Sequence, residues 1–236
     1  MQKVRSEWGL QGVEALRERC PVLVIVDVLS FSTCVDVAVH RHARIYPFAY
    51  GDEDAARDEA ARIGARLAAS RRAGGQLSLS PASLLKLNPG ERLLLPSPNG
   101  SRLSLAGGRA TVLAGCLRNA KAVAAKAKGL ADGRDIAVIP AGERWPDGSL
   151  RPAIEDLIGA GAVIEALGLP MSPETQVAHD AFVSARAHLA DVIKGCMSGR
   201  ELSDRGHELD VDIALELDIS HCAPMLRNGA YEDAAA

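Results

Sequence analysis

The chain has 236 residues, of which 47% are hydrophobic and 24% charged, and its net charge is −3. These values are ordinary for a globular protein with a sizeable core, and they exclude a disordered chain and a basic nucleic-acid surface. No apolar run approaches the length of a bilayer span, so we expect neither a membrane nor a nucleic acid as partner.

The five cysteines indicate a reducing compartment. They are odd in number, widely spaced and without a C-x-x-C pair, which argues against a disulfide framework or a zinc site. The first residues, M-Q-K-V-R-S-E-W, lack the apolar segment of a signal peptide. We therefore expect a cytoplasmic protein.

Strands and helices alternate in the first half of the chain. Residues 22–28 (V-L-V-I-V-D-V) form a nearly continuous β-branched run, which predicts a strand buried on both faces. Ser30, Ser32 and Thr33 are N-cap candidates for a helix that runs to about residue 42, and residues 45–49 are a short strand candidate. Residues 52–70 carry charge pairs four apart and predict a helix, and the Gly- and Ser-rich residues 71–81 predict a loop.

The second half continues the alternation, with strands predicted at 92–95, 111–114, 136–139 and 221–226 and helices at 119–128, 152–167, 173–189 and 210–217. Residues 198–201 (S-G-R-E) have the spacing of a capping box, which predicts an N-cap at Ser198. The alternation predicts the α/β class, as a three-layer α/β/α arrangement with a largely parallel or mixed sheet. No linker divides the chain, so we expect one domain over residues 1–236, or two intimately packed subdomains.

Acidic residues gather where one strand ends and the next helix begins. Residues 139–156 read I-P-A-G-E-R-W-P-D-G-S-L-R-P-A-I-E-D, with Glu143 in the loop and Glu155 and Asp156 in the opening turn of the helix. Such acids at a strand end predict a hard cation and a phosphorylated ligand. The alternative is that Glu155 and Asp156 only complement the helix dipole. Adjacent helical residues point about 100° apart, so we expect only one of them to face the site.

Asp27 lies at the end of a predicted strand, just before a Ser/Thr-rich turn. The carboxyl ends of parallel strands bind ligands in open α/β sheets, so Asp27 could ligate a metal, act as a base or serve as a nucleophile. The alternative is that it caps the turn through Ser30 or Ser32. Backbone N–H groups around Ser32 and Thr33, at the helix start, favour an anion.

Two further turns carry candidate anion-binding groups. Residues 96–101 (P-S-P-N-G-S) could form a nest of N–H groups at Asn99, Gly100 and Ser101, or a plain tight turn. Arg118 could clamp an acid group bidentately or act as a surface salt-bridge partner. The neighbouring Cys116 is interpreted as a buried small residue, with a thiol nucleophile as the alternative.

Taken together, these segments resemble the 2-phosphosulfolactate phosphatase family. The matching pieces occur in the family's order from about residue 20 to 229: V-I-V-D-V-L-S-F-S-T, P-S-P-N-G-S, A-G-C-L-R-N-A, A-G-E-R-W…I-E-D-L-I-G-A-G and S-G-R-E-L…R-G-H-E-L-D-V-D. The resemblance implies an unusual α/β fold and a Mg²⁺-dependent phosphatase acting on a small sulfonated phosphoester. It implies site positions at Asp27, Asn99, Glu143, Glu155 and Asp156, and an anion-binding helix start at Ser198, Gly199 and Arg200.

The chain departs from the family pattern in two motifs. Many relatives have D-V-L-R-A-T-T where this chain has D-V-L-S-F-S-T, so Ser30 replaces an arginine, and many have T-T-N-G-T where this chain has S-P-N-G-S. The loss of an anion-binding arginine weakens the argument for a sulfonated substrate more than the argument for phosphatase chemistry. It also motivates a second hypothesis, a family member that binds an anionic metabolite without turnover.

The leading hypothesis is hydrolysis of a small anionic phosphomonoester, 2-phosphosulfolactate yielding 3-sulfolactate and phosphate. Asp27 and Glu143 would be catalytic, and Mg²⁺ would be held by Asp27 and by Glu155 or Asp156. Arg118 and Arg200 would hold the acid group at the far end of the substrate. A third hypothesis is a metal-independent hydrolase that uses Cys116. The Ala-rich, aromatic-poor helices would suit a homodimer.

Overall fold

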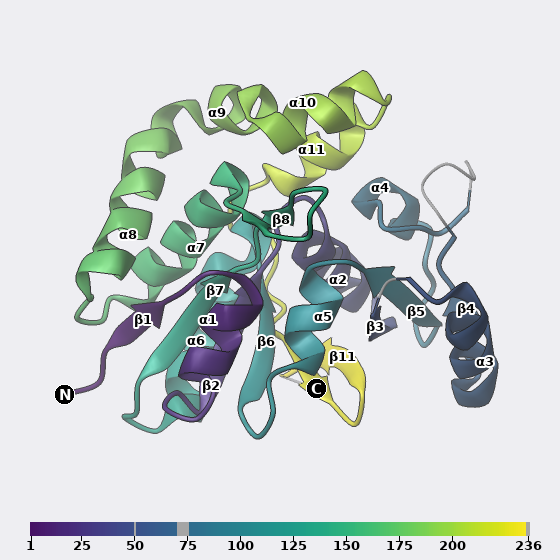
Figure 1. Cartoon of the computed structure of the whole chain (residues 1–236), viewed down its shortest axis with the longest axis horizontal. Coiled ribbons are helices and arrows are strands. Elements are labelled where there is room, and N and C mark those ends of the chain that lie inside the picture. The colour runs from purple at the N-terminus through teal and green to yellow at the C-terminus, as the bar shows by residue number, and fades with distance from the viewer. Residues whose placement is uncertain (50, 70–75, 235–236) are drawn as a thin grey trace.

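The computed structural model describes residues 1–49, 51–69 and 76–234. In this part of the chain nine strands form one mixed sheet with helices on both faces, and two short strands form a separate hairpin (Figure 1). This confirms the predicted three-layer α/β/α arrangement.

The strands are β1 (Val4–Ser6), β2 (Val22–Val26), β3 (Arg44–Ala49), β4 (Arg66–Leu67), β5 (Arg92–Ser97), β6 (Thr111–Gly115), β7 (Ile136–Pro140), β8 (Glu143–Arg144), β9 (Leu150–Arg151), β10 (Pro224–Arg227) and β11 (Ala230–Asp233). The helices are α1 (Gly9–Leu16), α2 (Phe31–His40), α3 (Glu53–Ile63), α4 (Pro81–Leu84), α5 (Gly100–Leu105), α6 (Ala120–Ala131), α7 (Ile154–Leu167), α8 (Pro173–Ala185), α9 (Leu189–Gly195), α10 (Met197–Asp204) and α11 (Glu208–Ala214), with 3₁₀ turns η2 (Leu117–Asn119) and η3 (Arg186–His188).

The strand order of the sheet is β1-β7-β2-β6-β10-β11-β3-β5-β4. β1, β7, β2 and β6 are parallel, and so are β3, β5 and β4. Three antiparallel pairings, β6–β10, β10–β11 and β11–β3, separate the two groups, so β5 runs opposite to β2. The carboxyl ends of β2 and β7 therefore meet at one edge of the sheet, where a ligand site is expected.

Alternate residues of β2 feed two separate cores. Val22, Val24 and Val26 pack with residues of α6, α7 and α8. Leu23 and Ile25 pack on the opposite face with residues of α1, α2 and α5. Since successive side chains of a strand point to opposite faces, this continuous apolar run explains why β2 lies at the centre of the molecule.

Two predicted helices end earlier than expected. The helix predicted over 52–70 is α3, which ends at Gly64 because this residue adopts the left-handed conformation with φ 63°, and β4 follows it directly. The helix predicted over 173–189 divides into α8, η3 and α9. Part of the loop predicted at 71–81 falls outside the described residues.

The predicted N-cap at Ser198 is wrong. α9 ends at Gly195, and the chain turns there so that Cys196 becomes the N-cap of α10, its Sγ accepting a hydrogen bond from Gly199 N at 3.4 Å. Ser198 therefore lies inside the first turn of α10. None of the described helices combines the length and apolarity that a bilayer crossing requires.

The contact between α7 and α8 gives a test of the fold. A Cβ at Gly161 would lie 2.1 Å from the backbone oxygen of Ala178, so Gly161→Ala should force the helices apart and lower the free energy of unfolding by roughly 2 kcal/mol. Gly129 in α6 has nothing within 4 Å of such a Cβ, so Gly129→Ala should stabilise by up to about 1 kcal/mol. Urea unfolding measures both, and equal effects would contradict this helix packing.

Candidate functional site

Asp27 follows the last residue of β2 and is almost fully buried. One carboxylate oxygen, Oδ1, accepts a hydrogen bond from Phe31 N at 3.0 Å, and Oδ2 accepts one from Gly100 N at 2.9 Å. Phe31 is the first residue of α2 and Gly100 the first of α5. One carboxylate thus joins the starts of two helices, where negative charge is favoured.

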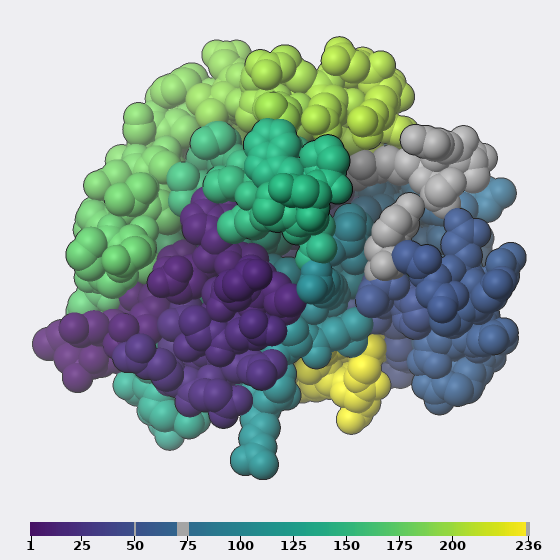
Figure 2. Space-filling view, viewed as in Figure 1, coloured from purple at the N-terminus to yellow at the C-terminus, as the bar shows by residue number. Residues whose placement is uncertain are grey.

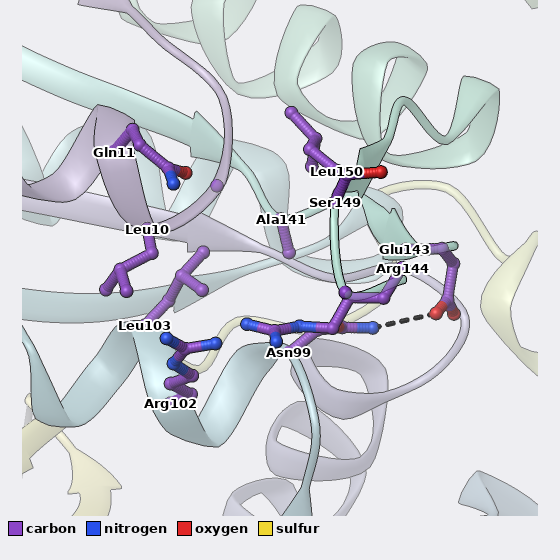
Figure 3. Close-up of a pocket in the computed structure, with 12 residues that line it drawn as sticks. Leu10, Gln11, Asn99, Arg102, Leu103, Ala141, Glu143, Arg144, Ser149 and Leu150 are labelled. Atoms are coloured by element: carbon purple, nitrogen blue, oxygen red, sulfur yellow. Dashed lines mark hydrogen bonds between the residues drawn. The ribbon is translucent and has the colours of Figure 1, made fainter. Parts of the chain in front are cut away.

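Gly100 lets the turn after β5 reach this position. A Cβ on Gly100 would lie 2.2 Å from Phe31 Cδ1, so a larger residue would displace the turn. The strong twist of the sheet between β6 and β5 (Figure 1) allows β5, which runs opposite to β2, to deliver its end to the same place. The neighbouring Asn99 donates a hydrogen bond from Nδ2 to Glu143 Oε2 at 2.9 Å (Figure 3).

Glu155 and Asp156 point in different directions from the first turn of α7. Both carboxylate oxygens of Asp156 accept backbone hydrogen bonds, from Val28 N at 2.7 Å and Gly142 N at 2.8 Å. Asp156 therefore ties the segments that follow β2 and β7. Glu155 instead accepts a hydrogen bond from the thiol of Cys196, at 3.2 Å from Oε2.

Asp27, Glu143, Glu155 and Asp156 form what we call the acidic cluster. Burial, followed by the negative charge of Asp27, raises the pKa of Glu143 from 4.5 to about 7, and Glu155 acts in the same direction. Burial and the charges of Asp27 and Glu155 also raise the pKa of Asp156. The charges of Asp27 and Glu155 thus act on both Glu143 and Asp156, which places the four carboxyl groups in one site.

The acidic cluster offers the oxygen ligands that Mg²⁺ prefers. No three His, Cys, Asp or Glu side chains of the described residues are arranged to hold a metal ion. Mg²⁺, however, usually takes one or two protein carboxylates and completes its shell with water and phosphate oxygens. Burial first, and then the charges of Asp27 and Glu155, raise the pKa of Glu143 and Asp156, and a divalent cation would offset both effects, so the donor set fits this ion.

The side-chain hydroxyls of Ser32, Thr33 and Ser101 bond to the backbone around Asp27. Ser32 Oγ accepts from Asp27 N and donates to Ile25 O, Thr33 Oγ1 donates to Val28 O, and Ser101 Oγ donates to Leu95 O. The backbone N–H groups of Ser32 and Gly100 also bond to Asp27. These residues hold Asp27 in place from all sides.

Arg118 lies in a buried ion-pair network. Its Nε donates to Asp36 Oδ2 at 2.8 Å, and its Nη1 bonds to Glu216 and to Ile213 O. The Asp36 and Arg118 side chains are at most 7% exposed. Arg118 is thus a salt-bridge partner, as one of the two alternatives predicted. The pair is buried, however, and not on the surface, and it links η2 to α2 and α11.

The thiol of Cys116 is fully buried, and burial raises the pKa of Cys116 well above the usual thiol range. A nucleophilic cysteine must be a thiolate. This environment favours the interpretation of Cys116 as a buried small residue.

Arginines that the sequence analysis did not select lie beside the acidic cluster. A cavity of about 160 Å³ is lined by Asn99 and Glu143 together with Arg102 of α5 and Arg144 of β8 (Figure 3). Arg151 of β9 lies opposite Glu143 of β8 in the register of the hairpin, and its charge lowers the pKa of Glu143. The strands β8 and β9 have two residues each, which is too short for an alternation pattern that could have selected Arg151 from the sequence.

A family model described as 2-phosphosulpholactate phosphatase matches residues 12–229. The chain belongs to the 2-phosphosulfolactate phosphatase family. It is also 31% identical over 213 residues to the 2-phosphosulfolactate phosphatase of Methanothermobacter thermautotrophicus strain Delta H, covering 89% of this chain and 88% of that protein. Membership of this family places the chain among the phosphoric monoester hydrolases.

The structure brings together five positions that the family resemblance implied, Asp27, Asn99, Glu143, Glu155 and Asp156. The family's helix-start motif is placed differently. Ser198 lies beside Arg151, Gly199 packs against the backbone of Ile193, and Arg200 is exposed and donates to Gly195 O.

Glu143→Gln should stabilise the protein at high pH when divalent ions are removed. The fold raises the pKa of Glu143 from 4.5 to about 7, so the folded state binds this proton more tightly than the unfolded state. Stability is therefore lost as the pH rises from the unfolded to the folded pKa. We expect a gain of roughly 2 kcal/mol at pH 8 and none at pH 4, measured by urea unfolding in EDTA. The exposed Glu201→Gln is the control, and a gain that does not depend on pH would contradict the assignment.

Arg118→Leu should destabilise the fold, since it leaves Asp36 buried without its partner. We expect a loss of about 3 kcal/mol in the free energy of unfolding, part of which the double variant Asp36→Leu/Arg118→Leu recovers. Urea unfolding checks both. Unchanged stability together with a raised KM would show instead that Arg118 clamps the substrate.

Proposed function

We propose that this chain is a Mg²⁺-dependent phosphatase that hydrolyses a small anionic phosphomonoester, with 2-phosphosulfolactate, giving 3-sulfolactate and phosphate, as the first substrate. The observation that carries the proposal is the acidic cluster at the ends of β2 and β7 in a member of this family. The methanogen relative is named 2-phosphosulfolactate phosphatase, which supports 2-phosphosulfolactate as the substrate.

Asp27 and Glu155 are the proposed Mg²⁺ ligands, and Asp156 positions the strand ends around them. Both carboxylates accept two backbone N–H groups, Asp27 from the starts of α2 and α5 and Asp156 from Val28 and Gly142. A bound Mg²⁺ would neutralise phosphate charge and orient the attacking group. This assignment selects Glu155 over Asp156 because Glu155 alone of the two lines a cavity.

Glu143 is the proposed proton carrier. Its pKa of about 7 suits a group that takes a proton from water or gives one to the leaving oxygen near neutral pH. Asn99 fixes its carboxyl group by the hydrogen bond at 2.9 Å. Arg102 and Arg144, on the neighbouring cavity, offset the negative charge that would repel an anionic substrate.

The second candidate, a member that binds an anionic metabolite without turnover, is favoured by Ser30, which stands where many relatives have arginine. It predicts thermal stabilisation by phosphosulfolactate without phosphate release. We further propose a cytoplasmic protein, supported by the free thiols of Cys20, Cys116, Cys196 and Cys222. We also propose a homodimer, which sedimentation would measure.

Phosphate release from 2-phosphosulfolactate and a panel of small phosphoesters tests the proposal. We expect activity with Mg²⁺ and its loss in EDTA, and a fall in kcat of at least about 100-fold in Asp27→Asn and Glu155→Gln. The exposed Glu201→Gln should keep full activity. Full activity in EDTA, or in Asp27→Asn, would contradict the metal role given to these carboxylates.

A further inference from the structure

A second cavity, of about 260 Å³, lies against the β8–β9 hairpin and has no role in the function proposed so far except through Glu155. Trp145, Ile154 and Met197 contribute apolar walls, and Arg151 and Glu155 contribute charge. In Figure 2 the hairpin residues, in green, lie between the yellow-green atoms of α10 and the purple atoms of α1. The cavity is large enough for a ligand with a three-carbon skeleton.

Arg151 is an unusual arginine in this setting. It is only 9% exposed, and buried arginines are normally paired with a carboxylate. Within the described residues it has no salt-bridge partner, and its one side-chain hydrogen bond joins Nη2 to Ser198 Oγ at a long 3.5 Å. Its guanidinium carbon lies 5.8 Å from the centre of the Trp145 ring. A guanidinium has five N–H donors, so most of this one's capacity is left for a ligand.

The start of α10 adds a second, weaker attraction for an anion. Ser198 lies in the first turn of this eight-residue helix and bonds to Arg151. The first N–H groups of a helix lack intrahelical partners and favour negative charge. The fork of Arg151 matches two oxygens of a carboxylate or sulfonate, which is the geometry that arginine recognises best.

The cavity shares one side chain, Glu155, with the acidic cluster. Glu155 lines the cavity, and its charge raises the pKa of both Glu143 and Asp156. A ligand in this cavity would therefore lie beside one carboxylate of the acidic cluster. The arginines expected from the sequence are less suited, since Arg118 is held by Asp36 and Arg200 is exposed.

We propose that Arg151, assisted by Ser198, binds the acid group of the substrate that is not hydrolysed, and so selects phosphomonoesters that carry a second anionic group. The inference rests on the proposed phosphatase function and deepens it by assigning a residue to substrate choice. Burial of Arg151, which is 9% exposed, would strengthen this ion pair.

The test compares three substrates in wild type, Arg151→Gln and Arg151→Lys. 2-Phosphosulfolactate carries a sulfonate and a carboxylate, 2-phospholactate a carboxylate only, and glycerol 2-phosphate neither. We expect Arg151→Gln to raise KM about 10- to 150-fold for substrates whose acid group it binds, with kcat changed less than about 3-fold. Glycerol 2-phosphate should be unaffected, and Arg151→Lys should recover part of the loss.

The pattern identifies the acid group. An effect on 2-phosphosulfolactate alone supports a sulfonate, and an effect on both acidic substrates supports a carboxylate. An equal effect on all three, or none, overturns the proposal. Arg205→Gln, an exposed arginine that follows α10, is the control for charge removal and should change none of the three.

Binding of 3-sulfolactate, measured by calorimetry, separates this proposal from the proposed function. We expect Arg151→Gln to weaken this binding about 10- to 150-fold, with a thermal midpoint close to that of the wild type in the absence of ligand. Equal affinities, or no binding to the wild type, overturn the subsite even if phosphate is released. Arg151-dependent binding without phosphate release supports the subsite and contradicts the phosphatase function.

Discussion

The carboxylate of Asp27 is the contact on which the rest of the site depends. Its two oxygens accept N–H groups from the first residues of α2 and α5, and Gly100, the first residue of α5, lies 73 residues from Asp27 in the sequence. Because β5 runs opposite to β2, nothing in the parallel-sheet architecture alone would bring α5 here. The helix starts satisfy the buried charge, and the buried charge in turn holds the two helices at the end of β2.

The position of Asp27 places its buried carboxylate close to three other carboxyl groups, which is electrostatically unfavourable. Neighbouring residues offset this only in part. Four carboxyl groups lie in one site, and burial together with the charges of Asp27 and Glu155 raises the pKa of Glu143 and Asp156. Asp156 is compensated by the N–H groups of Val28 and Gly142, and Glu143 by Asn99 and Arg151. Functional sites commonly keep such uncompensated charge, since it binds a cation or holds a proton near neutral pH.

Much of this could be predicted from the sequence, wherever one local pattern sufficed. The continuous apolar run of β2 located Asp27 at a strand end, and the acids after β7 were found from the same rule. The reversal of β3, β5 and β4 could not be predicted, because strand pairing is non-local. The helix α5 was not predicted, because the sequence N-G favours a turn. In the structure Gly100 begins this helix, and its N–H group donates to Asp27. The position of Arg118 before a helix predicted a substrate-binding role. Its partner Asp36 could not be predicted, because it comes from a distant segment of the sequence.

The contrast between Arg118 and Arg151 shows what decides the role of a buried arginine. Both side chains are nearly inaccessible, so desolvation penalises both unless an anion lies beside them. Arg118 has that anion within the chain, and the pair joins η2 to α2. Arg151 has instead a long bond to a hydroxyl, an aromatic ring and a cavity that reaches Glu155. An incompletely paired, buried guanidinium lowers the stability of the folded state. A bound anion would restore that stability, so the stability of the hairpin depends on whether the site is occupied.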